Sequence, residues 1–230
     1  MMSKNLETKR ILLTPCADLQ VREDVAEGGA RSRTITGYAI LFDTPSAPLW
    51  SDEKSEAREV IAPEAITREV LDASDIKFTM FHDRQLILAR SRNGAGTLSY
   101  SVDERGVKFE FEAPNTIDGD KALELVRRGD IAGCSFAFST YYGDTEFVSR
   151  AMEERDGKTM VTYTVRALTG IYDFTLAADP AYPDTSVEAR ELVDELRKES
   201  KPADMPDREK EIGEQLREMR RAASRKLLKL

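Results

Sequence analysis

Short runs that alternate apolar and polar residues fill the middle of the chain and constrain its fold most strongly. Val107, Phe109 and Phe111 alternate with charged residues, and a period of two is typical of a strand with one buried face. Other runs rich in β-branched and aromatic residues lie at 33–42, 76–81, 96–103, 135–140, 160–166 and 171–177. Such runs favour strands, so the sequence predicts a domain made mainly of β-structure.

Two helices are predicted between these strands. Residues 63–73 begin with proline and have acidic residues in the first turn, and residues 118–128 begin with acids and end in Arg-Arg-Gly. Both patterns match the preferences of helix ends. The predicted fold class is therefore α+β, a mostly antiparallel β-barrel-like domain with peripheral helices.

The composition changes near residue 184, which sets the predicted domain boundaries. Residues 184–230 hold 12 acidic and 12 basic residues and no aromatic ones, a composition that does not bury a core. Apolar residues in this part recur at helical spacing. We expect an N-terminal extension at 1–23, the main domain at 24–183 and a charged helical tail at 184–230. The tail would recruit the chain to a partner or be removed by self-cleavage; the alternative is a helix that packs on the main domain of the same chain.

Overall charge and composition exclude several classes of function. The chain has 34 Lys and Arg residues against 42 Asp and Glu residues, a net charge of −8, which disfavours nucleic acid as a partner. No apolar run is long enough to cross a bilayer, and Met1 to Arg10 do not resemble a signal peptide. With one histidine and two cysteines, we expect no structural zinc site and no cofactor.

His82 is the only histidine, so it is the only candidate for an imidazole base. Counting by two along the strand places it on the face of Ile76, Phe78 and Met80, where that strand ends. The alternative is a half-buried histidine that closes the strand and has no chemical role.

Ser135 is the candidate nucleophile in the segment GDIAGCSFAFST. It shares a face of small residues with Ala137 and Ser139, a face suited to solvent or to a groove that accepts a peptide. The alternative is an ordinary exposed serine. Cys134 is a rival nucleophile, but it shares a face with Phe136 and is expected to be a buried, inert thiol.

Asp173 is predicted to lie in the middle of the strand at 171–177, where carboxylates are unfavourable without a partner. His82 would be a chemically suitable partner, because a carboxylate fixes the tautomer of an imidazole and stabilises its protonated form. A salt bridge to an arginine is the alternative.

Five segments, in this order, resemble the maturation proteases of tailed-phage proheads. They are RTITGYAILFDT, REVIAPEAI, FHD with the LILARS that follows, ELVRRGDIAGCSFAF and IYDFTLAADPAYPDT, which together span about 33–185. Two departures stand out, because Glu64 and Ala137 occupy positions where the family usually has glycine. Neither replaces a reactive side chain.

The resemblance implies a fold like the herpesvirus assemblin barrel and the activity of a serine endopeptidase. Carried over residue by residue, His82 matches the catalytic histidine, Ser135 the nucleophile and Asp173 the acidic third member. The implied substrates are scaffold segments or the major capsid protein precursor, cleaved inside the assembling prohead in the host cytoplasm. Further copies of the same chain are an additional candidate partner.

Two alternatives come from other classes of protein. The chain could be a non-catalytic prohead assembly or scaffold protein that uses the same domain as a binding module. It could also be a cysteine hydrolase that pairs Cys134 with His82.

Overall fold

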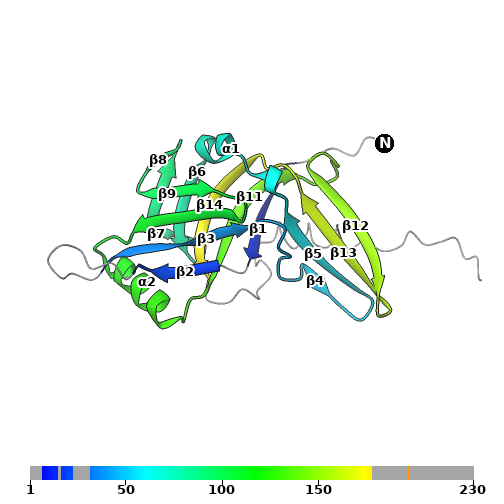
Figure 1. The fold of residues 1–230 in the computed structure, drawn as a ribbon, viewed down its shortest axis with the longest axis horizontal. Coiled ribbons are helices and arrows are strands. Elements are labelled where there is room, and N and C mark those ends of the chain that lie inside the picture. The colour runs from blue at the N-terminus through cyan, green and yellow to red at the C-terminus, as the bar shows by residue number, and fades with distance from the viewer. Residues whose placement is uncertain (1–6, 15–16, 23–31, 178–195, 197–230) are drawn as a thin grey trace, which may run out of the picture. The chain divides into compact units, whose positions relative to one another are not determined.

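The computed structural model describes residues 7–14, 17–22 and 32–177, together with Leu196. The chain divides into two units, Met1–Val193 and Asp194–Leu230. In the first unit, strands greatly outnumber helices and form three sheets (Figure 1). The fold is therefore mostly β with few helices, as predicted. Apart from Leu196, the predicted tail at 184–230 lies outside the described residues.

The largest sheet has six strands and joins segments that are distant in sequence. From edge to edge it contains β1 (Glu7–Thr14), β11 (Gly133–Tyr141), β14 (Gly170–Ala177), β6 (Asp75–Met80), β7 (Asp83–Arg92) and β8 (Ala95–Gly96). Neighbouring strands are antiparallel, except that β14 and β6 run parallel. The central strands β11, β14 and β6 thus bring the three candidate segments side by side.

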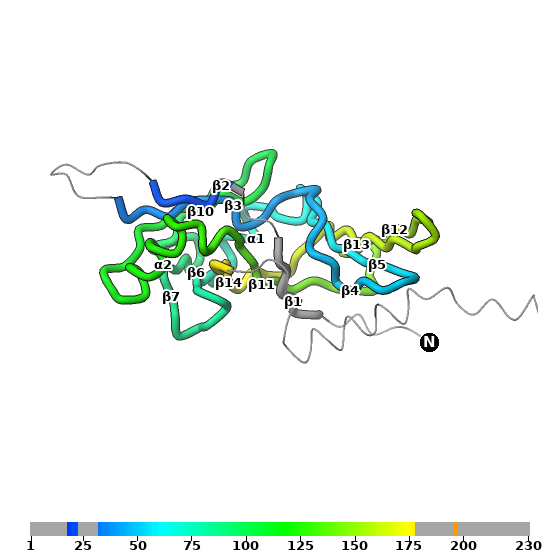
Figure 2. Tube along the Cα trace, turned by 90° about the horizontal axis from the view of Figure 1, so that it is seen from below, coloured from blue at the N-terminus to red at the C-terminus, as the bar shows by residue number. Residues whose placement is uncertain are grey.

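The other two sheets among the described residues have four strands each. One contains β2 (Ala17–Val21), β3 (Thr34–Leu41), β10 (Gly106–Glu112) and β9 (Leu98–Val102). The other contains β12 (Val148–Arg155), β13 (Lys158–Val165), β5 (Ser55–Ile61) and β4 (Trp50–Ser51). Figures 1 and 2 both place this last sheet at the opposite end of the unit from helix α2 (Ile117–Arg128).

No closed barrel is present in the part of the chain that the structure describes. Each of the three sheets ends in edge strands on both sides, so the barrel-like architecture expected from the sequence is corrected to three open sheets. Alternation of apolar and polar residues identifies single strands. Whether a sheet closes into a barrel depends on which strands, distant in sequence, pair with each other.

The core lies where β10 packs against the large sheet. Val107, Phe109 and Phe111 are buried, as their alternation predicted. The ring of Phe78 on β6 lies 4.6 Å from that of Phe109 and 4.5 Å from that of Phe111, measured between centroids. One face of the large sheet is thereby covered with aromatic side chains.

The two predicted helices are present with altered bounds. The segment 63–73 divides into a 3-10 turn at Pro63–Ala65 and helix α1 at Arg68–Ala73. It divides because Thr67 is extended and caps α1, accepting a hydrogen bond from the amide of Val70. Helix α2 ends at Arg128 and is capped by Gly129, whose φ of 76° lies in the left-handed region that favours glycine.

The N-terminal segment contributes strands to two sheets. The sequence predicts an N-terminal extension at 1–23, and β1 and β2 lie within that range. β1 pairs antiparallel with β11, with Leu13 opposite Ser135, and β2 pairs with β3. The segment ETKRILLT lacks a period of two, so alternation does not predict this strand.

Candidate active site

Ser135 and Asp173 lie on neighbouring antiparallel strands and share one face of the large sheet. Ser135 is paired with Thr175, and Asp173 is paired with Ala137. Paired residues in a sheet direct their side chains to the same face, so the hydroxyl and the carboxylate are diagonal neighbours there. The small side chain of Ala137 leaves room beside Asp173.

His82 reaches this face from the two-residue turn between β6 and β7. Phe81 and His82 have φ values of 57° and 56°, and Met80 is paired with Asp83 across the turn. Positive φ at both central residues is the geometry of a type I′ hairpin, usually made with Asn and Gly. Such conformations in other residues cost on the order of 1–3 kcal/mol and are found mainly at functional sites.

The turn corrects the face predicted for His82. Alternation stops at Met80, the last residue of β6, because the left-handed backbone at Phe81 and His82 reverses the chain. The His82 side chain therefore lies on the face of Ser135 and Asp173, opposite to the buried row of Phe78 and Met80.

The imidazole of His82 bridges the other two candidate residues. Its Nδ1 lies 2.7 Å from Oδ1 of Asp173, and its Nε2 lies 2.8 Å from Oγ of Ser135. With Nδ1 protonated, Nδ1–H donates to the carboxylate and Nε2 accepts from the serine hydroxyl. This order of hydrogen bonds allows a histidine to take a proton from a serine. The structure thus brings the three predicted residues together.

Burial distinguishes the alternatives for Ser135 and Cys134. Both side chains are fully buried, so Ser135 is not an exposed serine, and its face of the strand does not lie open to solvent. Cys134 shares the other face of β11 with Phe136, and both ring nitrogens of His82 are engaged by Ser135 and Asp173. This arrangement favours Ser135 over Cys134 as the partner of His82.

The lysine paired with Asp173 in the sheet binds a different carboxylate. Lys77 is paired with Asp173 across β6 and β14, but its ammonium group donates to the carboxylate of Asp75, 3.1 Å away. Arg90 binds the same carboxylate with two hydrogen bonds of 2.7 and 2.6 Å. These bonds, chiefly those from Arg90, hold the pKa of Asp75 well below its usual range.

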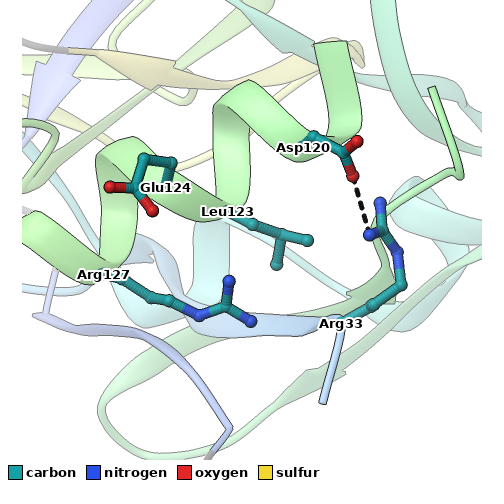
Figure 3. A pocket seen from close by; sticks show the side chains of 5 residues that line it. All are labelled: Arg33, Asp120, Leu123, Glu124 and Arg127. Atoms are coloured by element: carbon teal, nitrogen blue, oxygen red, sulfur yellow. Dashed lines mark ion pairs between the residues drawn. The ribbon is translucent and has the colours of Figure 1, made fainter. Parts of the chain in front are cut away.

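A surface pocket of about 430 Å³ lies beside α2 (Figure 3). Its lining residues are Arg33, Asp120, Leu123, Glu124 and Arg127. Arg33 and Asp120 form an ion pair of 2.7 Å across it. None of the lining residues belongs to the cluster of Ser135, His82 and Asp173.

A comparison with known families identifies the family of the chain. The family model described as caudovirus prohead serine protease matches residues 17–199. The chain belongs to this family. The prohead protease match includes β6, β11 and β14, the strands on which the cluster is built.

Among solved structures, the capsid assembly protease of bacteriophage T4 is similar, with a TM-score of 0.40 and 10% identity. The similarity covers 75% of this chain and 100% of that chain. No curated protein matches this chain. No helix among the described residues has the length and apolar character needed to span a membrane.

Two buried threonines beside the cluster were not identified from the sequence. Thr175 accepts a hydrogen bond from the amide of His82, and Thr79 donates a hydrogen bond to Thr175. The available signal was a hydroxyl at matching positions of two strands that are otherwise largely apolar, but the pairing of those strands was needed to interpret it.

Proposed function

We propose that the chain is a serine endopeptidase in which Ser135 is the nucleophile, His82 the general base and acid, and Asp173 the group that orients His82. The observation that carries this proposal is the continuous hydrogen-bonded series Asp173–His82–Ser135. Membership of the prohead serine protease family supports it independently.

In the first step, Oγ of Ser135 attacks the carbonyl carbon of a peptide bond. The hydroxyl proton passes to Nε2 of His82, and the imidazolium is stabilised by the carboxylate of Asp173. The tetrahedral intermediate then collapses, the C–N bond breaks, and His82 gives the proton to the leaving amine. The product is an ester between the substrate and Ser135.

In the second step, water attacks this ester. His82 takes a proton from the water and returns it to Oγ of Ser135, which restores the enzyme and releases the carboxylate product.

The substrate class follows from the family. A protease of phage proheads acts on proteins of the assembling shell, and we propose scaffold segments or the capsid precursor as substrates of this chain. Cleavage would take place inside the prohead in the host cytoplasm.

The test is a cleavage assay with the full-length chain and the scaffold protein of the same phage, with fragments identified by mass spectrometry. Ser135→Ala is expected to remove nearly all cleavage. Ser139→Ala is the matched control, because Ser139 is also a buried serine on β11 and its hydroxyl contacts Thr169 and Tyr172 instead of His82. Cys134→Ala is expected to keep its activity.

Each alternative has its own outcome. Loss of cleavage in Cys134→Ala, with activity kept in Ser135→Ala, would identify a cysteine hydrolase. Absence of cleavage by the unaltered chain, together with binding to the scaffold, would identify a non-catalytic assembly protein.

A further inference from the structure

We propose that Thr175 is a positioning residue, whose hydroxyl holds the backbone of His82 in the left-handed conformation that directs the imidazole between Ser135 and Asp173. The proposal rests on the proposed function, because it concerns the same histidine. Thr175 does not take part in the chemistry and acts only through His82.

The first observation is the hydrogen bond between the turn and β14. The amide of His82 donates to Oγ1 of Thr175 at 3.0 Å, and the amide of Phe81 donates to the carbonyl of Leu176 at 3.1 Å. Both residues with positive φ therefore have their amide groups fixed by consecutive residues of β14. β14 also carries Asp173, so one strand sets the position of both the histidine and its carboxylate partner.

The second observation is that the Thr175 hydroxyl is itself oriented. Thr79 lies directly beside it on β6, in parallel register, and donates a hydrogen bond of 2.9 Å to its Oγ1. Both threonines are fully buried, so water does not compete for these bonds. A hydroxyl has two acceptor sites, and those of Thr175 are taken by Thr79 and His82.

The side chains at the turn are only partly enclosed by packing. Phe81 is 47% exposed, and the His82 side chain is held by its hydrogen bonds to Asp173 and Ser135. A non-glycine residue with positive φ persists only where its surroundings determine its conformation. The hydrogen bond that the amide of His82 donates to Oγ1 of Thr175 acts on the backbone and leaves both ring nitrogens available.

The test compares two substitutions at Thr175 in the full-length chain. Thr175→Val keeps the branched shape and removes the hydroxyl, whereas Thr175→Ser keeps the hydroxyl. Thr140→Val is the matched control, because Thr140 is a fully buried threonine of the same sheet whose hydroxyl donates to the carbonyl of Ala167. Cleavage of scaffold protein gives kcat and KM, and nitrogen-15 NMR follows the ring of the only histidine.

We expect kcat to fall roughly 10- to 100-fold in Thr175→Val with KM nearly unchanged, since small displacements of a catalytic group have effects of this size. The Nδ1–H signal of His82 should shift or broaden in the same variant. Thr175→Ser should restore both measurements, and Thr140→Val should alter neither.

Unchanged kcat and unchanged His82 signals in a folded Thr175→Val protein would overturn the proposal. If Thr175→Val does not fold, the Thr79→Val variant is tested in its place by the same measurements of kcat and of the His82 signals. It should lower kcat by a smaller factor and perturb the His82 signals, and no effect on either would reject the proposal. Activity retained in Ser135→Ala would contradict the proposed function instead, and the NMR signals would still report on Thr175.

Discussion

Ser135 and Asp173 lie two positions out of register on adjacent strands, because Ser135 is paired with Thr175 while Asp173 is paired with Ala137. The hydroxyl and the carboxylate are therefore separated along the sheet, and the imidazole of His82 spans the gap with bonds of 2.8 and 2.7 Å. The relative register of β11 and β14 thus fixes the positions of the serine and the aspartate, and His82 lies between them.

Replacing the Asp173 carboxylate by an amide should reduce cleavage less than loss of Ser135 or His82. In Asp173→Asn, kcat should fall by up to roughly 10⁴-fold, because the amide permits the wrong imidazole tautomer and carries no charge to stabilise the imidazolium. Steady-state cleavage of scaffold protein measures the loss. Asp83→Asn removes an exposed carboxylate beside His82 and should have little effect. If kcat fell equally in Asp173→Asn and Asp83→Asn, negative charge near His82 would matter and the hydrogen bond between Asp173 and His82 would not.

The pH dependence of cleavage should show one ionisation on its acid side. His82 must be neutral at Nε2 to accept the proton of Ser135, so activity is lost as pH falls and the imidazole becomes protonated. An activity that stays constant from about pH 5 to 8 would argue against His82 as the base.

The ion pair of Asp75 with Arg90 should stabilise the fold in a pH-dependent way. Because the pKa of Asp75 is lowered in the folded protein, its contribution is complete above the usual pKa of 3.8 and is lost as pH falls through the folded value. Both side chains are more than one third exposed, so we expect Asp75→Asn to cost only about 0.2–1 kcal/mol near neutral pH.

Urea unfolding at several pH values measures this contribution. The difference between the unaltered chain and Asp75→Asn should shrink as the solution is acidified below about pH 4. Asp156→Asn, in the exposed turn between β12 and β13, is the control. A difference that grows on acidification would contradict the sign of the pKa shift.

Strand-like patterns allowed much of the fold and part of the site to be predicted. Alternation placed Ser135 on the small-residue face of β11, apart from Cys134, and Asp173 on the equivalent face of β14. Both placements depend only on local periodicity, which a strand fixes whatever it pairs with.

The placement of His82 could not be predicted in the same way. The turn made by Phe81 and His82 has no glycine that would indicate positive φ. Its left-handed backbone is held by hydrogen bonds to Thr175 and Leu176, which are far away in sequence. The presence of strand β1 and the open edges of the three sheets also depend on pairing between segments that are distant in sequence. Periodicity identifies strands, but their partners are set by tertiary packing.

The most direct test of a single catalytic unit is a double-mutant cycle of Ser135→Ala and His82→Ala, measured as cleavage of scaffold protein by folded, full-length chains. Each substitution should lower kcat by a factor on the order of 10⁵ to 10⁶, and the double variant should be little worse than either one, because the two residues carry out the same proton transfer. Losses that multiply in the double variant, or cleavage that survives in Ser135→Ala, would contradict the account.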